Sequence, residues 1–298
     1  MQSLVIIGSF DGVHLGHQQL IKEAKDRALK CGLLLTAITF EPQPSLFFNR
    51  TSKVLSSLEE RLLLLKKYGV PRVEVVDFES VYNSTAEEFL RGIHTEMQVC
   101  QVVVGENFTF GKDKGGEASD LVKYASEIGM EARVVPLFSN SSGPISSSKI
   151  RILINEGKLE EANSMLGHPY LIYGVVVAGN KIGTQIGYET ANMRHPGYKL
   201  LPPLGVYASW VNYKGNFYMG VLNIGISPTF NRNSIVPEVH ILDYSQNLMG
   251  DFLEIYPVKY LREEKKFSGP EELRLAISRD IEKTRYLLNM VSVPDFMV

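Results

Sequence analysis

Two histidines, His14 and His17, are separated by only two residues, of which the second is Gly16. Residues 3–8 predict a short buried strand and residues 18–30 a helix, so the histidines fall in a tight turn between them. The start of a helix has unpaired N–H groups and the positive end of the helix dipole, and both attract phosphate. Imidazoles placed there donate hydrogen bonds to phosphate oxygens. The turn therefore predicts a nucleotide-phosphate site suited to nucleotidyl transfer.

The residues before the histidine pair make the signal specific. A lone His-x-Gly-His match is weak, because a single loop histidine is usually solvated or packed in a core. Here it ends the run Gly8-Ser-Phe-Asp-Gly-Val-His-Leu-Gly-His17, which follows a predicted strand and opens a predicted helix. We call residues 8–17 the histidine turn. Its candidate nucleotide-binding residues, besides the histidines, are Gly8, Phe10, Asp11 and Gly16.

A second phosphate-type run, Ile145-Ser-Ser-Ser-Lys-Ile-Arg151, follows a Gly-Pro loop and opens another predicted helix. Capping of the helix explains one serine at such a position. Three serines followed by two cations combine N–H groups, hydroxyls and positive charge, which suits a triphosphate. Arg151 adds the planar fork that matches phosphate oxygens. The nucleotide-binding candidates of this run are Ser146, Ser147 and Ser148.

The first half of the chain alternates continuous apolar runs with helical patterns. The apolar runs are residues 4–7, 33–40, 73–76, 99–104 and 132–137, and the helical patterns include residues 58–68 and 117–128. This alternation predicts an α/β nucleotidyltransferase domain, with a Rossmann-like, doubly wound parallel sheet covered on both faces. Such sheets bind ligands beyond the carboxyl ends of their strands. The histidine turn and Gly105-Glu-Asn-Phe-Thr-Phe-Gly111 fall at that edge.

The pattern changes near residues 167–169. Short apolar stretches divided by Gly, Pro and Asn follow at residues 170–177, 205–211, 218–224, 238–242 and 252–258, and predict an antiparallel barrel or sandwich. A helix begins near residue 268, and its stripe of Leu273, Ile277, Ile281 and Leu288 is typical of core packing. We place the domains at residues 1–167 and 168–298.

The bulk composition limits the partners. The 298 residues have a net charge of −2, which disfavours wrapping of nucleic acid. No apolar run approaches the roughly 20 residues that span a bilayer, and no leader pattern opens the chain. Cys31 and Cys100 lack metal-ligand spacing and are interpreted as reduced thiols of a cytoplasmic protein. We expect a monomer or weak homo-oligomer that binds neither nucleic acid nor membrane.

The ordered motifs resemble one family. The histidine turn, Thr39-Phe-Glu-Pro-Gln-Pro44, residues 105–111 and residues 145–151 are similar to the adenylyltransferase half of the bacterial bifunctional riboflavin kinase/FMN adenylyltransferase (FAD synthetase) family. The second half resembles its kinase half, at residues 183–192, 205–207, 223–230, 238–243 and 262–267. The resemblance implies a riboflavin kinase barrel with a C-terminal helix. It also implies ATP and Mg²⁺, with riboflavin, FMN and FAD as substrates and products.

The resemblance also implies roles in the first half. His14 and His17 contact the ATP phosphates while the FMN phosphate attacks the α-phosphorus. Arg151, with Ser147 and Ser148, holds the phosphate chain and the leaving pyrophosphate. On the flavin side the resemblance implies Asn107, with Phe108 and Phe110 either stacked on the ring or packed as ordinary core aromatics. Residues 40–44 shape the loop after the second strand, where Glu41 is interpreted as structural.

In the second half, the resemblance assigns the magnesium site to Thr190 and Asn192, whose oxygens suit Mg²⁺ when phosphates supply the other ligands. Glu238 is the candidate general base for the ribityl 5′-hydroxyl, and an exposed strand carboxylate is the alternative. Three glycines fit loops that let the backbone approach phosphate. They are Gly174, Gly179 and Gly183.

The kinase signature departs from the usual G-R-x-L-G-F-P-T-A-N at two positions. Thr184 replaces the arginine, and Glu189 replaces the proline. Glu189 is interpreted either as a residue that faces water or as a metal ligand. We expect a working but altered kinase. Three alternatives stay open. One is an FMN adenylyltransferase with a weak or inactive kinase domain, another is a non-catalytic flavin- or nucleotide-binding protein, and the third is a transferase with another acceptor, such as a pantetheine-like phosphate.

Overall fold

A computed structural model of the chain describes residues 2–136, 138–140, 143–179, 187–227, 234–290 and 293. It divides into two compact units, Met1–Lys149 and Ile150–Val298. The first unit is built on a five-stranded sheet and the second on a closed barrel, and each unit is described by itself.

The first unit contains a five-stranded parallel sheet in the order β3-β2-β1-β4-β7. Its strands are β1 (Ser3–Ile7), β2 (Leu34–Glu41), β3 (Arg72–Asp77), β4 (Val99–Gly105) and β7 (Glu131–Val135). Every residue of the central strand β1 is buried, which explains its unbroken apolar run. The predicted parallel sheet is confirmed; of the run 132–137, Leu137 lies outside the described residues.

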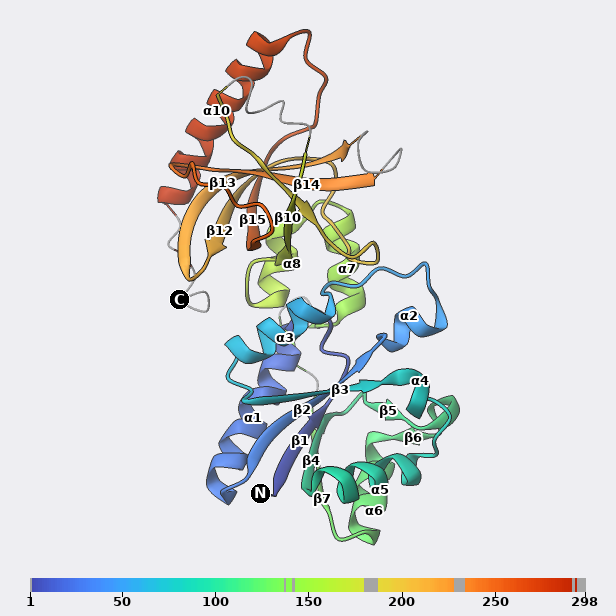
Figure 1. Cartoon of the computed structure of the whole chain (residues 1–298). Coiled ribbons are helices and arrows are strands. Elements are labelled where there is room, and N and C mark those ends of the chain that lie inside the picture. Colours follow the sequence, from blue (N-terminus) through green and yellow to red (C-terminus); the bar gives the residue numbers. More distant parts are fainter. Residues whose placement is uncertain are drawn as a thin grey trace. The chain divides into compact units, whose positions relative to one another are not determined.

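Helices cover both faces of this sheet (Figure 1). The longer ones are α1 (Leu15–Cys31), α3 (Leu58–Lys67), α5 (Ala86–Met97) and α6 (Ala118–Glu127). Helices α5 and α6 share one apolar core with the sheet, in which Leu90 and Leu121 are fully buried. Short elements lie between them: η1 (Asp11–Val13), α2 (Pro44–Phe48), α4 (Phe78–Val81), β5 (Thr109–Phe110), η2 (Lys112–Lys114), β6 (Gly116–Glu117), β8 (Ser139–Asn140) and β9 (Gly143–Pro144).

The second unit is built on a closed barrel in the order β10-β11-β14-β13-β12-β15. Its strands are β10 (Ile172–Val177), β11 (Ala191–Arg194), β12 (Gly205–Tyr213), β13 (Asn216–Ser227), β14 (Ser234–Ile241) and β15 (Phe252–Arg262). Helices α7 (Ser147–Asn155) and α8 (Leu159–Leu166) precede the barrel, and α7 begins at the end of the first unit. The predicted barrel is confirmed. Among the described residues, no helix combines the length and apolarity needed to cross a membrane.

The C-terminal helix α10 (Pro270–Asn289) packs on the barrel. Ile281 contacts the buried cluster of Val206, Val221 and Leu242. Beside it, the buried carboxylate of Asp280 accepts hydrogen bonds from Arg262 Nε at 3.0 Å and Nη2 at 2.8 Å. This ion pair fastens the end of β15 to the helix.

Asp280→Asn is expected to lower the free energy of unfolding of the second unit by about 2 kcal/mol, because it removes the anion from a pair in which Arg262 is itself only partly exposed. Urea unfolding followed by fluorescence of Trp210, the single tryptophan, reports this unit. Asp243→Asn is the matched control, since Asp243 pairs with Arg285 of the same helix at the surface. Equal midpoints for both variants would contradict the assignment.

Candidate active sites

The histidine turn has a strained backbone. Phe10, Gly12 and Val13 have φ values of 48°, 78° and 40°. Left-handed φ suits glycine but is unfavourable for a β-branched residue such as Val13. Such strain persists only where the surroundings fix the conformation, and it is frequent at ligand sites.

Two remote serines hold this turn in place. The backbone N–H of Ser56 donates to Asp11 Oδ1 at 3.0 Å, and Ser56 Oγ accepts from the backbone N–H of Gly12 at 2.8 Å. The Ser147 hydroxyl donates to the carbonyl oxygen of Asp11 at 3.0 Å. The Asp11 carboxylate is therefore engaged inside the protein. The Ser147 contact brings the two phosphate-type motifs together.

The histidines lie further into the helix than predicted. Helix α1 begins at Leu15 with His14 as its N-cap, so His17 belongs to the first turn of the helix. The two rings stack with centroids 3.8 Å apart, and the Phe10 ring meets His17 edge-on. A Cβ on Gly16 would lie 3.3 Å from the His14 ring, so glycine there leaves room for the stacked pair.

Burial sets the charge of His17. Its pKa lies well below 6.5, first because desolvation disfavours the imidazolium and second because His14 is close. Its buried Nδ1 has no hydrogen-bond partner among the described residues. Without a ligand, His17 is therefore a neutral imidazole at neutral pH.

The serine run opens helix α7. Ser146 Oγ accepts from the backbone N–H of Lys149 at 3.3 Å and so caps the first turn. Ser148 is exposed, whereas Ser147 is partly buried. Arg151 lies four residues after Ser147 in the same continuous helix, which puts both on one helix face.

An apolar cavity of about 600 Å³ lies in the first unit, and we call it the aromatic cavity. Its aromatic lining consists of Phe40, Phe48, Phe78, Tyr82, Phe89, Phe108 and Phe110. Phe108 and Phe110 stack with centroids 5.4 Å apart, and Phe110 also belongs to the core. Asn107 is exposed and does not line the cavity. Gly8, at the end of β1, is tied to Ile38 of β2 by a backbone hydrogen bond of 3.1 Å.

Sequence reasoning missed most of these rings. Phe48 belongs to α2, whereas Phe78 and Tyr82 lie at the two ends of α4, and rings from distant segments leave no common spacing in the sequence. The one available signal is the pair of phenylalanines at 47–48, directly after the loop of residues 40–44. Phe48 is 70% exposed, which is high for so large an apolar side chain.

In the second unit, three predicted residues meet at the barrel. Asn192 of β11 pairs with Glu238 of β14. Thr190 Oγ1 donates to Glu238 Oε1 at 2.5 Å, and Asn192 Nδ2 lies 3.5 Å from the same oxygen. A hydroxyl, an amide and a carboxylate are thus gathered at one point.

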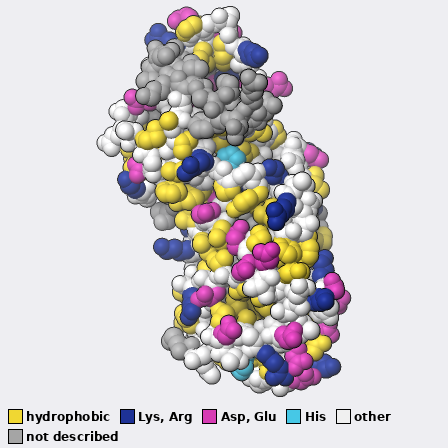
Figure 2. All heavy atoms as spheres, turned by 45° about the vertical axis from the view of Figure 1, so that its right-hand side comes forward, with side chains coloured by type: hydrophobic (Ala, Val, Ile, Leu, Met, Phe, Trp, Pro, Cys, Tyr) yellow, Lys and Arg dark blue, Asp and Glu magenta, His cyan; other side chains and the backbone are white. Residues whose placement is uncertain are grey.

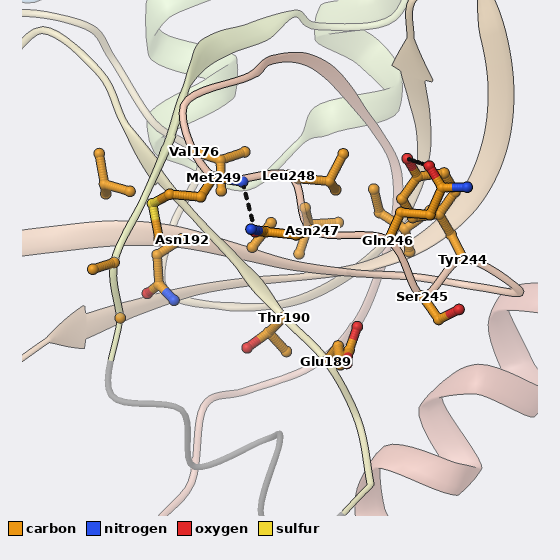
Figure 3. A pocket seen from close by; sticks show the side chains of 16 residues that line it. Val176, Glu189, Thr190, Asn192, Tyr244, Ser245, Gln246, Asn247, Leu248 and Met249 are labelled. Carbon is orange, nitrogen blue, oxygen red and sulfur yellow. Dashed lines mark hydrogen bonds between the residues drawn. The ribbon is translucent and has the colours of Figure 1, made fainter.

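Beside them lies a cavity of about 460 Å³, the barrel pocket (Figure 3). It is lined by Gly179, Glu189, Thr190, Asn192 and the loop of residues 244–249, among others. A Cβ on Gly179 would fall 2.0 Å from Asn192 Nδ2, so any other residue there would displace the Asn192 amide. The loop 244–249 gives no signal in the sequence, because its residues carry no motif.

The other kinase glycines differ from Gly179. Gly174 lies within β10, outside the lining of the pocket, and a Cβ there would fall 2.4 Å from the Arg194 carbonyl oxygen. Close strand pairing thus accounts for that glycine. Gly183 and Thr184 lie outside the described residues.

The barrel site fits Mg²⁺ only together with a ligand. The described residues include no group of three or more His, Cys, Asp or Glu side chains able to hold a metal. The oxygens of Thr190, Asn192 and Glu238 are hard donors of the kind that Mg²⁺ prefers, and phosphate oxygens would complete its shell. Glu189 lines the same pocket, and its carbonyl oxygen accepts from His240 Nδ1 at 2.7 Å.

A Rossmann-like sheet with a phosphate-type turn, followed by a closed barrel with a carboxylate–hydroxyl–amide cluster, defines a two-part enzyme that handles nucleotides. Comparison with protein families agrees. The model described as FAD synthetase matches residues 1–149, and the model described as riboflavin kinase matches residues 166–288.

Curated relatives match nearly the whole chain. The bifunctional riboflavin kinase/FMN adenylyltransferase of Listeria monocytogenes is 37% identical, over 96% of this chain and 92% of its own length. The protein of the same name from Bacillus subtilis is 35% identical, over 97% and 94%. The chain therefore belongs to the bifunctional riboflavin kinase/FMN adenylyltransferase family.

A solved structure has the same fold across the chain. A crystal structure from Streptococcus pneumoniae, named a macrolide-efflux protein, is 32% identical with a TM-score of 0.82, over 95% of this chain and 94% of that one. That name differs from the names of the curated relatives. The two family models, matched in order, carry the family assignment.

The lowered pKa of His17 predicts a pH dependence of stability. The unfolded chain binds the proton near pH 6.5 and the folded chain binds it less tightly, so stability is fully present above pH 6.5 and is lost as the pH falls below it. Calorimetry between pH 5 and 8 should therefore find that the melting temperature of the first unit falls on acidification. His17→Asn should flatten this dependence, and a parallel fall in the variant would contradict the assignment.

Proposed function

We propose that the chain makes FAD from riboflavin in two ATP-dependent steps. In the second unit, riboflavin and ATP give FMN and ADP. In the first unit, FMN and ATP give FAD and pyrophosphate. The observation that carries the proposal is the Ser147–Asp11 contact, which joins two phosphate-type helix starts in the unit that also holds the aromatic cavity.

In the adenylyl transfer, His14 and His17 donate hydrogen bonds to the ATP phosphates. Ser147, Ser148 and Arg151 hold the phosphate chain, with backbone N–H groups from both helix starts. An FMN phosphate oxygen attacks the α-phosphorus, the bond from that phosphorus to its bridging oxygen breaks, and pyrophosphate leaves with the electron pair. No covalent enzyme intermediate forms, so positioning and charge stabilisation supply the rate.

The charge of the ligand changes the state of His17. Without ligand its imidazole is neutral because burial lowers its pKa. A triphosphate beside it favours the imidazolium and raises the pKa again. Binding of ATP therefore favours uptake of a proton by His17, which adds a cation where the leaving group becomes more negative.

The aromatic cavity is the flavin site of this proposal. A cavity lined by Phe78, Tyr82, Phe108 and Phe110 suits a flat, largely apolar isoalloxazine ring, because aromatic rings stack on one another. Asn107 is exposed beside Phe108, where it is available to the polar edge or the phosphate of FMN.

In the phosphoryl transfer, Glu238 accepts the proton of the ribityl 5′-hydroxyl, and the hydroxyl oxygen attacks the γ-phosphorus as ADP leaves. The hydrogen bond from Thr190 orients the carboxylate. Thr190 and Asn192 also hold Mg²⁺, which neutralises charge on the phosphates when bound. Gly179, which lines the pocket, lets the nucleotide approach the backbone.

The remaining expectations complete the proposal. The functional halves are residues 1–167 and 168–298, supported by the start of the first barrel strand at Ile172.

The face in Figure 2 carries Lys and Arg interspersed with Asp and Glu, which supports small-molecule partners over nucleic acid. Cys31 and Cys100 are free thiols, in keeping with a cytoplasmic enzyme, and we propose a monomer or weak homo-oligomer.

A second candidate is an FMN adenylyltransferase whose barrel phosphorylates riboflavin poorly. The observation that favours it is Glu189, which lines the barrel pocket beside Thr190 where the family signature has proline. Its carboxylate repels phosphate if it faces the nucleotide. Its exposure instead supports an orientation toward water.

Two reciprocal variants separate the activities. His17→Ala should lower FAD formation from FMN by about 100-fold, the effect typical of removing one charge-stabilising donor, while riboflavin phosphorylation persists. Glu238→Gln should abolish riboflavin phosphorylation and leave FMN adenylylation unchanged. Both are measured by incubating the protein with riboflavin or FMN and Mg-ATP and separating FMN from FAD by chromatography over time.

The same assay on the protein without substitutions distinguishes the candidate functions. Formation of FMN and then FAD supports the bifunctional enzyme, whereas FAD from FMN without FMN from riboflavin supports the weak kinase. If a folded sample turns over neither flavin, the proposal is wrong, and the two alternatives left are the non-catalytic binding protein and the transferase with another acceptor. Loss of both activities in folded His17→Ala would contradict the division of labour.

A further inference from the structure

A fully buried guanidinium lies under the histidine turn. Arg61 of α3 is 0% exposed. Its Nη1 donates to the carbonyl oxygens of Ser9 at 3.2 Å and Phe40 at 3.0 Å, and to Thr39 Oγ1 at 2.8 Å. Its Nη2 donates to Glu41 Oε2 at 2.5 Å. The cation therefore has acceptors from the segment after β1 and from the end of β2.

A buried charge in this place is informative. Removing a cation from water is unfavourable unless it is paired and hydrogen-bonded, and an apolar side chain of similar size often stabilises a fold as well or better. If position 61 only had to fill space in the core, leucine or methionine would serve there. Arg61 instead supplies several directed hydrogen bonds from one rigid planar group, which fixes the relative positions of the backbone segments it touches.

Arg61 joins the two sides of the adenylyltransferase site. Ser9 belongs to the histidine turn, where the phosphates would bind. Phe40 lines the aromatic cavity, where the flavin would bind. One guanidinium thus contacts the backbone of both sides and sets the spacing between them.

The segment that carries Arg61 makes further contacts to the same two loops. Ser56 binds Asp11 and Gly12 of the histidine turn, and its carbonyl oxygen accepts from Gln43 Nε2 at 3.0 Å. Ser57 and Glu60 form a capping box that fixes the start of α3 at 57–60, directly before Arg61. The start of α3 is therefore a rigid base for the guanidinium.

We propose that Arg61 is a positioning residue for adenylyl transfer, which keeps the phosphate-binding turn and the flavin-binding cavity at the spacing that the reaction needs. The proposal rests on the adenylyltransferase function given above. Because reacting atoms must be aligned closely, a displacement of about 1 Å costs about 100-fold in rate even when it originates away from the chemistry. Loss of this positioning is therefore expected to lower kcat more than it weakens the binding of either substrate alone.

The test uses Arg61→Lys in the full-length protein. Lysine keeps the charge but replaces the planar fork by a single ammonium, so it cannot serve all the acceptors in the same geometry. We expect kcat for FAD formation from FMN to fall by about 10-fold or more, with KM for ATP and for FMN changed much less. Riboflavin phosphorylation by the same molecules should stay unchanged.

Arg91→Lys is the matched control. Arg91 is in the same unit, on α5, and forms an exposed ion pair with Glu87. It makes the same chemical change without touching the site, so FAD formation should equal that of the parent. Calorimetry should verify that both variants are folded at the assay temperature.

Rescue separates positioning from folding. Arg61→Ala leaves a space shaped for a guanidinium ion, and millimolar guanidinium chloride should restore part of the lost kcat, while sodium chloride of equal strength should not. If Arg61→Ala does not fold, the kcat-against-KM split of Arg61→Lys decides alone.

Glu41 provides a pH readout. Burial raises the pKa of its carboxyl, and Arg61 opposes that rise. Weakening the pair in Arg61→Lys should move the acidic limb of the FAD-formation pH profile upward within the pH range in which calorimetry shows the variant to be folded.

The outcomes are distinct. A folded Arg61→Lys protein with the kcat of the parent would overturn the positioning role while leaving the proposed function intact. A fall in activity that only follows the unfolded fraction would also overturn it. If the parent itself forms no FAD from FMN, both the proposed function and this proposal fail.

Discussion

The first unit depends on hydrogen bonds that hold an unfavourable backbone in place. Phe10, Gly12 and Val13 have left-handed φ values. Glycine adopts this conformation readily, but phenylalanine and valine do not. Ser56 and Ser147 supply the compensating contacts from distant parts of the unit. The turn thus presents His14 and His17 at the start of α1 only after the unit has folded, so the candidate phosphate site is a product of tertiary structure.

The second unit gathers its polar groups by a different means. Strand pairing in the closed barrel sets Asn192 opposite Glu238, and Thr190, which directly precedes the same strand, donates a hydrogen bond to the Glu238 carboxylate. No strained turn is needed among these residues. The requirement here is space, because Gly179 has to leave room for the Asn192 amide. The two sites therefore respond differently to mutation, one through loss of supporting contacts and the other through added atoms.

The sequence predicted the parallel sheet and the histidine turn because both have strong local signals. Strand β1 is buried throughout and reads as an unbroken apolar run. The start of α1 was placed too late, since His14 is an unusual N-cap and offers no side-chain cap. Strand β11 was missed because Ala191–Arg194 is short and only half of its residues are apolar. Closure of the barrel depends on which strand edges pair with each other. Local sequence patterns do not contain this information, so they did not distinguish a barrel from a sandwich.

Residues that act through tertiary contacts were the hardest to predict. Arg61 follows a capping-box pair in a leucine-rich helix, where a charged residue reads as part of a solvated face. Only the fold reveals that it is buried among carbonyl oxygens of two loops. The aromatic cavity was not predicted for the same reason, since its rings come from β2, α2, α4, α5 and the segment after β4. Motifs predicted the candidate phosphate ligands, and the structure added the residues that hold the histidine turn in place.

The claim at the centre of this account is that the start of α1 grips the polyphosphate of ATP. A crystal structure of the full chain with FMN and a non-hydrolysable α,β-methylene analogue of ATP tests it directly. The account predicts phosphate oxygens within hydrogen-bonding distance of His14, His17 and Ser147, with the flavin in the aromatic cavity. An analogue bound in the first unit with its polyphosphate away from those three residues would contradict it.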